Sequence, residues 1–336
     1  MNQINQNVSI KPQLPISGGC LLPQWGIIFI EGPDATGFLQ NQLSNSLLGM
    51  KRTHDSDIAK STDSVRLVGY CSPKGRLIAS AWIGLFPASE SADDRYVLFI
   101  SKDIAASTAK RLAMYVLRSK VKVIDMSSEW SVSGFFDATT NNGFEILKTS
   151  KDHLVAEIPN VLAQDLTYKR YLIAHLANVK IESLSEGAID AWNDLEVLSA
   201  IPRIVLATQE QFVPQMINFE SVAGVDFKKG CYPGQEIVAR SQYRGAIKRR
   251  LFLVNITDDS ITEAQISPGT ELFHSGDPNQ PAGMVVLSTR SMLESGRIDL
   301  QVECKLDAHE SGSIHLGAPN GPVLKIDSLP YPLLEI

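Results

Sequence analysis

Residues 227–240 read FKKGCYPGQEIVAR, a stretch that predicts a tight bend carrying a cysteine. Pro233 and Gly234 suit the two central positions of a type II turn, because proline presets the first φ angle and glycine tolerates the positive φ of the second. Cys231 is therefore expected on a sharp bend. Residues 235–242, which follow the turn, read as a short helix or an extended segment.

The neighbours of Cys231 favour a thiolate, the form of cysteine that attacks, exchanges or ligates. Lys228 and Lys229 precede it, and a helix that begins after the bend would direct its positive end toward it. Glu236 and Arg240 are spaced to pair if that helix forms. The residues alone also allow a buried, unreactive cysteine in a glycine-containing loop, so both interpretations stay open at this point.

On either side of the bend the chain differs in character. Before it, helical and strand patterns alternate irregularly with hairpins, which favours an α+β fold over a doubly wound parallel sheet. After it come only short strands with turn residues between them, which predicts a small β-barrel. We therefore expect a flexible arm over residues 1–20, an α+β region of two subdomains over 21–246, and a C-terminal β-barrel over 247–336.

Individual elements follow from turn residues and periodicity. Ser72-Pro73-Lys74-Gly75 predicts a hairpin between two apolar runs, residues 50–64 read as a loop, and residues 168–176 are ambiguous between strand and helix. Helices are expected from 32–34 toward Gly49, from a cap at Ser101, and from Ser185 or Glu186 to about Leu198. Strands are expected at 25–30, 65–71, 76–86, 96–100, 121–125, 131–136, 154–158, 251–256, 270–274, 282–289, 298–303 and 323–326.

Length and composition bound the class of protein. The chain has 336 residues, enough for two or three domains, and its 44% hydrophobic and 20% charged residues are typical of a globular protein. No basic segment followed by an apolar one opens the sequence, and the apolar run 27–30 is too short to span a bilayer. These features predict a cytoplasmic protein without a membrane partner.

The spacing of the cysteines and histidines along the sequence predicts no metal site. The four cysteines, Cys20, Cys71, Cys231 and Cys304, lie far apart, and the six histidines show no ligand spacing. So few cysteines in a long chain indicate a reducing compartment. The motifs GxGxxG, GxxxxGK[ST], GxSxG and HExxH are also missing, so the sequence offers no start for a nucleotide-dependent or hydrolytic activity.

Charge is uneven along the chain. The net charge of −6 argues against a protein that binds nucleic acid through bulk positive charge. Residues 226–250, however, hold seven basic and two acidic side chains, a net of +5. An anionic partner such as a polyglutamate tail or an RNA backbone could dock on this basic segment, 228–250, and a merely solvated surface is the alternative.

At this point the residues resemble a known family. KGCYPGQE, residues 229–236, matches the KGCYxGQE signature of the folate-binding, tRNA-modifying YgfZ proteins, relatives of the glycine-cleavage T-protein, an aminomethyltransferase. Four further segments, at 32–43, 71–76, 212–218 and 329–331, are similar to that family as well, so the resemblance covers roughly residues 20–332.

The resemblance implies a T-protein-like fold of two interleaved α+β domains followed by a β-barrel, around a central opening. It implies tetrahydrofolate as the bound molecule and a role in maintaining iron–sulfur enzymes, including those that thiolate tRNA. Trp25 and Trp192, which from the residues alone could be core or could stack on a heterocycle, fall where that family contacts folate. It also implies further folate contacts at Gln215 and Asn218, and a functional thiol at Cys231 with Lys229, Tyr232, Gln235 and Glu236 around it.

One segment departs from the family pattern. Many folate-binding relatives carry Glu-x-Gly before a hydrophobic-Pro pair, where the carboxylate accepts hydrogen bonds from pterin N–H groups. This sequence has Leu198-Ser199-Ala200 there. Asp194 and Glu196 are the neighbouring carboxylates, but a shift of two residues along a helix is expected to point a side chain elsewhere.

Three functions follow as hypotheses. The first is a folate-binding accessory protein for iron–sulfur enzymes, with Cys231 as its redox or ligating group. The second is a folate-dependent one-carbon transferase, which would need a positioned acid or base that the sequence does not assign. The third is a folate-free module that binds RNA or protein through the basic segment.

Overall fold

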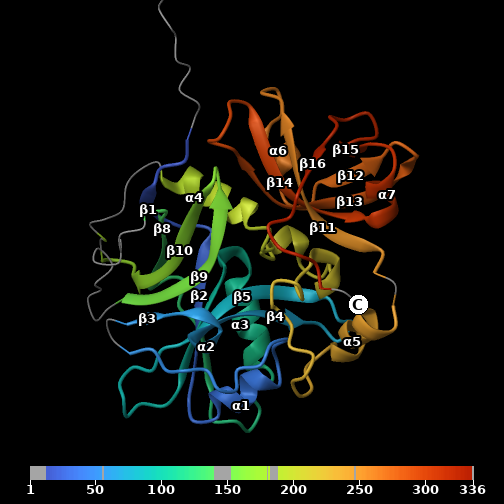
Figure 1. Cartoon of the computed structure of the whole chain (residues 1–336). Helices are drawn as coiled ribbons and strands as arrows, with labels where there is room; N and C mark the ends of the chain where they lie inside the picture. Colours follow the sequence, from blue (N-terminus) through green and yellow to red (C-terminus); the bar gives the residue numbers. More distant parts are fainter. Residues whose placement is uncertain are drawn as a thin grey trace, which may run out of the picture.

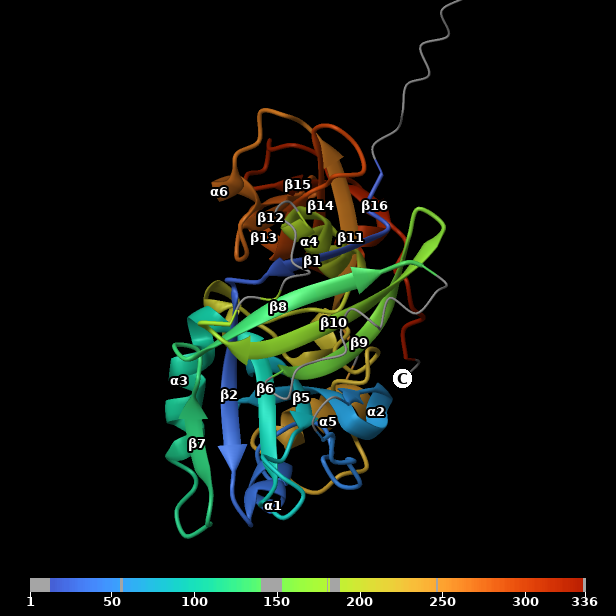
Figure 2. The same ribbon diagram turned by 90° about the vertical axis from the view of Figure 1, so that its left-hand side faces the viewer.

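The computed structural model describes residues 13–54, 57–139, 153–179, 181, 188–245 and 247–334. Within these ranges the chain forms three β-sheets with short helices at their edges (Figure 1). In Figure 2 the first sheet lies below, the second crosses it in the middle, and the third lies on top. The mixed α and β composition confirms the expected class.

The first sheet is antiparallel and begins with the predicted hairpin. Its strands, in order across the sheet, are β4 (Val65–Cys71), β5 (Leu77–Leu85), β6 (Arg95–Ser101), β2 (Trp25–Glu31) and β7 (Lys122–Asp125). Helix α3 (Lys102–Ala113) packs on it through Ile104, Ala105 and Leu112, which recur at helical spacing and are buried. The other helices here are α1 (Ala35–Gln40) and α2 (Ser61–Ser64).

The second sheet takes its strands from before, between and after those of the first. Across the sheet they are β1 (Ser17–Leu21), β8 (Trp130–Asp137), β10 (Leu166–Leu176), β9 (His153–Ala163) and β3 (Ile58–Ala59). Along the sequence, β1 and β3 thus alternate with β2 and β4 of the first sheet. One continuous apolar core joins the two sheets, because the buried faces of both contribute to it.

The third sheet follows helix α5 (Gln235–Tyr243) and curls toward closure. Its strands are β15 (Ile314–Leu316), β12 (Glu271–His274), β13 (Asp277–Arg290), β14 (Arg297–Lys305), β11 (Arg249–Thr257) and β16 (Lys325–Asp327), with α6 (Glu263–Ile266) and α7 (Leu306–Glu310) between them. Residues 322–327 join the two edges, since 322–324 bond to β15 and 325–327 pair with β11. The expected barrel is thus a curled sheet that this short segment closes.

Some expected elements differ in the structure. Residues 17–20, predicted as part of the arm, belong to β1, whereas residues 1–12 lie outside the described residues. The helix predicted toward Gly49 ends at Gln40, because the chain that follows bonds to the edge of β4, with the Ser44 amide donating to Gly69 O at 2.8 Å. The ambiguous residues 168–176 form a strand. The predicted helix start at Ser185 or Glu186 lies outside the described residues.

Helix α4 (Ala188–Leu198) connects the second sheet to the third. Asp194 is fully buried, and its carboxylate accepts hydrogen bonds from Met292 N at 2.7 Å and Thr289 Oγ1 at 3.1 Å. From the third sheet, Gln301 donates to the carbonyls of Glu196 and Val197. No helix of the described residues is long and apolar enough to cross a membrane.

The buried carboxyl of Asp194 predicts a pH-dependent stability. Burial raises its pKa to about 7, so between about pH 4 and pH 7 the folded protein holds a proton that the unfolded chain has lost. Stability from this group therefore falls as pH rises through that window, by on the order of 2–4 kcal/mol. Asp194→Asn cannot titrate. The melting temperature of the unmodified protein minus that of this variant should therefore be larger at pH 5 than at pH 8. If calorimetry gives the same difference in melting temperature at both pH values, the raised pKa of Asp194 is contradicted.

Candidate functional site

The predicted bend at Cys231 is present. Gly234 has φ 78° and ψ 1°, the values of the second central residue of a type II turn, and Gln235 N donates to Tyr232 O at 3.2 Å. Helix α5 begins directly after this turn. Cys231 is exposed, whereas Cys20, Cys71 and Cys304 are buried and burial raises the pKa of each thiol to about 12.

The bend is seated on the hairpin turn between β4 and β5. A Cβ on Gly234 would lie 2.3 Å from Ser72 O, and one on Gly75 would lie 2.7 Å from the Cβ of Ile237 in α5. Both glycines have positive φ, 78° and 70°. The two turns can therefore approach this closely only because both positions lack a side chain.

Lys229 anchors the bend from the other side. Its ammonium donates to Gln40 O and Leu43 O, each at 2.6 Å, and lies 4.7 Å from the ring centre of Tyr232. Burial lowers the pKa of Lys229 to about 8. Lys229 is thus a buried tie to the end of α1, and the charge of Cys231 acts against this lowering of its pKa.

The remaining residues of the signature lie around this anchor. Tyr232 is buried, and burial raises its pKa. Gln235 and Glu236 form the first turn of α5. Segment 235–242 is therefore helical, but Glu236 and Arg240, which are both exposed, form no ion pair with each other among the described residues.

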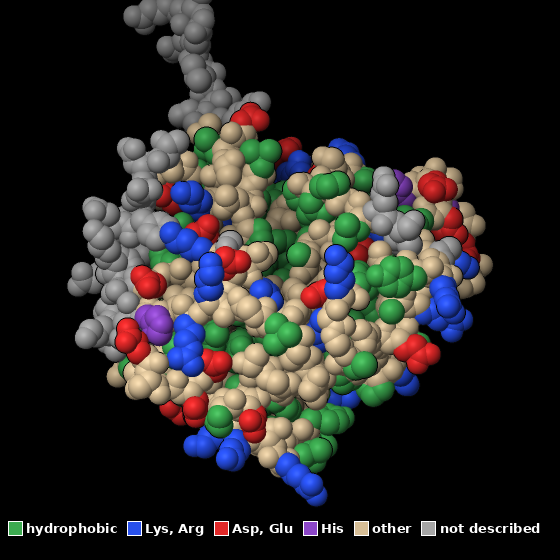
Figure 3. Space-filling model, turned by 60° about the horizontal axis from the view of Figure 1, so that its bottom comes forward, with side chains coloured by type: hydrophobic (Ala, Val, Ile, Leu, Met, Phe, Trp, Pro, Cys, Tyr) green, Lys and Arg blue, Asp and Glu red, His purple; other side chains and the backbone are tan. Residues whose placement is uncertain are grey.

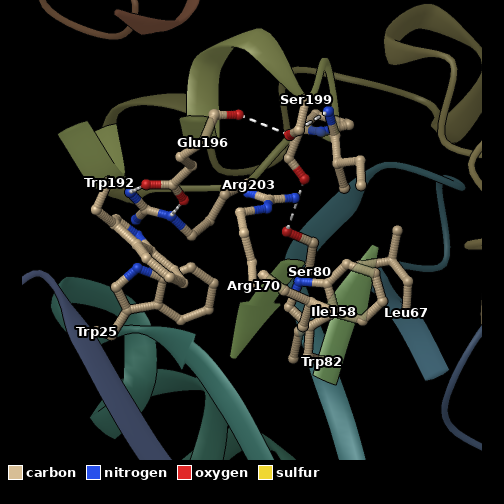
Figure 4. Close-up of a pocket in the computed structure, with 13 residues that line it drawn as sticks. Trp25, Leu67, Ser80, Trp82, Ile158, Arg170, Trp192, Glu196, Ser199 and Arg203 are labelled. Atoms are coloured by element: carbon tan, nitrogen blue, oxygen red, sulfur yellow. Dashed lines mark hydrogen bonds and ion pairs between the residues drawn. The ribbon is translucent and has the colours of Figure 1, made fainter. Parts of the chain in front are cut away.

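Trp25 and Trp192 line one narrow cavity (Figure 4). Trp25 opens β2, and Trp192 lies in α4 with its ring against the backbone of Gly134 in β8. The cavity measures about 20 Å³, room for about one water molecule. Both indole Nε1 groups are buried and have no hydrogen-bond acceptor among the described residues. This tryptophan cavity therefore holds two unmet donors between two aromatic surfaces.

Two arginines and one glutamate are the charged residues that line the tryptophan cavity. Arg203 Nε donates to Glu196 Oε1 at 2.6 Å and Nη2 to Glu196 Oε2 at 3.3 Å, while its guanidinium lies 5.0 Å from the ring centre of Trp25. Arg170 from β10 donates to the carbonyls of Pro159 and Leu195, and burial lowers its pKa to about 10. The cavity wall therefore carries a net positive charge.

The structure corrects the expectation for the carboxylates of α4. Glu196 lines the tryptophan cavity, although the two-residue shift from Leu198 was expected to direct it elsewhere. Its direction fits the ion pair with Arg203, which follows the end of the helix. Asp194, in contrast, points to the third sheet.

Gln215 and Asn218 do not line this cavity. Gln215 Nε2 donates to Val238 O in α5 at 2.9 Å, and Asn218 Nδ2 donates to Leu251 O in β11 at 2.9 Å. Both residues belong to the turn η3 (Pro214–Ile217) and its end, and both side chains are buried. In the structure they join α5 and β11 to this turn, and the folate contacts that the resemblance implied for them stay a prediction.

Two wider clefts adjoin the tryptophan cavity. A large cleft of about 1130 Å³ shares Leu67, Trp82 and Ile158 with it, and a side cleft of about 570 Å³ shares Glu196 and Arg203. Cys231 lines none of the three, but Phe227 and Lys228, which precede it, line the large cleft. The structure thus brings the two tryptophans together and places the thiol outside their cavity.

The basic segment is less charged at the surface than its sequence suggested. Lys229 is buried, Arg249 pairs with Glu303, and Arg250 pairs with the buried Glu220. The exposed cations that remain are Lys228, Arg240, Arg244 and Lys248. On the face drawn in Figure 3, basic and acidic side chains are interspersed over the surface.

The sequence of the chain is similar to those of known proteins. No protein-family model matches the chain. The chain is 28% identical, over 327 residues, to the tRNA-modifying protein YgfZ of Escherichia coli O7:K1 and of Escherichia coli O157:H7, covering 94% of this chain and 93% of each relative. The resemblance to the YgfZ proteins is confirmed.

A solved structure agrees at the level of the fold. The aminomethyltransferase T of the glycine cleavage system from Bartonella henselae matches with a TM-score of 0.60 over 94% of this chain and 86% of that one, at 13% sequence identity. This likeness shows a T-protein-like fold, as the YgfZ resemblance implied.

Sequence reasoning missed Arg170 and Arg203. Arg170 lies in a strand whose pattern is apolar, and Arg203 follows a proline without a motif around it. Arg170 follows Lys169 in that strand, and buried arginines are rare, so the sequence offered no signal for either residue.

The packing of the two turns predicts the effect of a methyl group at Gly234. Gly234→Ala should destabilise the protein by at least ~1–2 kcal/mol, because alanine is strained at positive φ and its Cβ meets Ser72 O. Gly230→Ala is the matched control, since a Cβ there meets nothing within 4 Å. Denaturant unfolding of the two variants tests this, and equal stability would show that the turns do not constrain each other.

Proposed function

We propose that the chain is a folate-binding accessory protein that supports iron–sulfur enzymes in the cytoplasm and thereby tRNA modification. The observation that carries the folate part is the pair of tryptophans on one cavity, each with an unmet indole N–H. The observation that carries the tRNA part is the similarity to YgfZ along almost the whole chain.

The residues of the tryptophan cavity fit a reduced pterin. Trp25 and Trp192 offer aromatic faces for stacking, and Glu196 with Arg170 and Arg203 offers an acceptor and donors for the polar edge of the ring. Tetrahydrofolate would supply a one-carbon carrier or a redox-active ring when bound. Because about 20 Å³ is too small for a pteridine, a lining side chain must move to admit it.

Cys231 is the residue that we propose to act on the iron–sulfur cargo. It is the one exposed cysteine among the four, and the anchors at Lys229 and Gly234 fix the backbone on both sides of it. A thiol on a rigid, accessible bend can meet a partner protein without a large ordering cost. The exposed cations of the basic segment, such as Arg240 and Arg244, lie on and after α5, where a transient RNA contact would be made.

A one-carbon transferase receives less support. Such an enzyme needs an acid or base beside the reacting carbon. Among the residues that line the tryptophan cavity, Glu196 is the only carboxylate, and it is bonded to Arg203. Asp194, the carboxyl whose pKa is raised to about 7, faces the third sheet.

Folate binding predicts quenching of tryptophan fluorescence. Tetrahydrofolate at micromolar concentrations should quench the emission, because three of the four tryptophans, Trp25, Trp82 and Trp192, line the proposed site. Trp192→Phe should weaken binding roughly tenfold, about 1.4 kcal/mol, through lost stacking. Trp130→Phe is the control, since Trp130 packs on Phe29 away from the cavity. No quenching and an unchanged melting temperature with ligand would remove folate from the function.

The role of the thiol predicts a loss of function in cells. Cys231→Ala should fold normally, because the side chain is exposed, yet should fail to restore tRNA thiolation in cells that lack the protein. Cys20→Ala, which alters a buried cysteine of β1, should restore it. Thiolated nucleosides measured by mass spectrometry report the result. Full restoration by Cys231→Ala would eliminate the thiol from the mechanism.

A further inference from the structure

The ion pair of Glu196 and Arg203 separates two spaces. Both residues line the tryptophan cavity and also the side cleft of about 570 Å³. Each side chain is only 11% exposed. The pair therefore forms a wall one side chain thick between a cavity too small for a ring system and a cleft large enough for one.

Arg203 occupies the surface that a bound ring would use. Its guanidinium covers Trp25 at 5.0 Å (Figure 4). Its Nη1 also donates to Ser101 Oγ at 2.9 Å. The side cleft on its other side is lined by Lys102 and by Asp103, whose Oδ2 accepts from Leu206 N and whose other oxygen is left for a further donor. Arg203 can thus leave Trp25 for a space that already contains an acceptor of opposite charge.

The hydrogen bonds within the pair show that the Glu196 carboxylate can accept two adjacent N–H groups at once. The two carboxylate oxygens receive two N–H groups of one planar guanidinium, Nε at 2.6 Å and Nη2 at 3.3 Å. A 2-amino-4-oxopyrimidine carries the same fork, because its ring N–H and its amino group are attached to one carbon. Such a ring can replace Arg203 at Glu196 without a change in the acceptor geometry.

We propose that Glu196 reads the 2-amino-4-oxopyrimidine edge of the bound heterocycle, and that Arg203 moves toward the side cleft to uncover Trp25. This proposal rests on the proposed folate binding and names the residue that gives it specificity. With Arg203 displaced, Arg170 balances the carboxylate, so the cavity suits a neutral ring. Pterins and guanine share this edge, and the chemistry at Glu196 is the same for both.

The test compares pterin with lumazine, which carries an oxygen in place of the 2-amino group. By isothermal titration calorimetry, the unmodified protein should bind pterin at least tenfold more tightly, because the lumazine oxygen faces a carboxylate. In Glu196→Gln the preference should vanish or reverse, since the amide can donate to that oxygen. Asp194→Asn, two residues away on the same helix and facing the third sheet, should keep the preference.

The outcomes separate this proposal from folate binding itself. If Glu196→Gln retains the tenfold preference, or the unmodified protein binds tetrahydrofolate without any preference for pterin, the assignment of Glu196 is overturned. If Glu196→Gln melts early because Arg203 is left unpaired, the double variant Glu196→Gln/Arg203→Gln, which buries no lone charge, gives the same readout. If the protein binds guanosine through Glu196 but does not bind tetrahydrofolate, the role of Glu196 in recognising the 2-amino-4-oxopyrimidine edge is supported. The proposed folate function is then overturned.

Discussion

The burial of helix α4 on both sides is the constraint on which the rest of the structure depends. Seven of its residues are buried, and they face two different neighbours. Trp192 packs on Gly134 of the second sheet, whereas Asp194 and the backbone carbonyls to which Gln301 donates tie the helix to the third. A carboxyl and backbone carbonyls at such an interface must be matched by donors, so the third sheet can dock in only one register. The position of the tryptophan cavity is thereby fixed by contacts on the opposite face of the same helix.

The position of the Cys231 bend depends on contacts other than those of helix α4. Its position depends on two glycines that let two turns meet, and on a lysine buried against the carbonyls at the end of α1. These contacts lie in the first sheet and α5, away from α4. The turn on which the bend is seated joins β4 and β5, and Leu67 and Trp82 of these strands line the tryptophan cavity, so the bend and the cavity share one support.

Local signals in the sequence predicted the parts of the fold that local chemistry determines. The hairpin at residues 72–75 and the turn at Gly234 follow from proline and glycine, and both are present. The predicted helix toward Gly49 failed because Ser44 bonds to β4, a partner distant in the sequence. The same limit explains the site: the sequence suggested the two tryptophans, but the direction of Glu196 depends on Arg203, and no spacing rule reports an ion pair across the end of a helix.

The separation of the thiol from the tryptophan cavity bears on how the two could cooperate. Cys231 lines neither the cavity nor its clefts, so a ring held between the tryptophans cannot be in contact with the thiol through those spaces. The large cleft nevertheless shares Leu67 and Trp82 with the cavity and is also lined by Phe227 and Lys228, which precede the bend. Lys229 lies between these cleft-lining residues and Cys231, and its bonds to Gln40 O and Leu43 O hold the backbone there, so the position of the thiol relative to the large cleft is fixed by a buried contact.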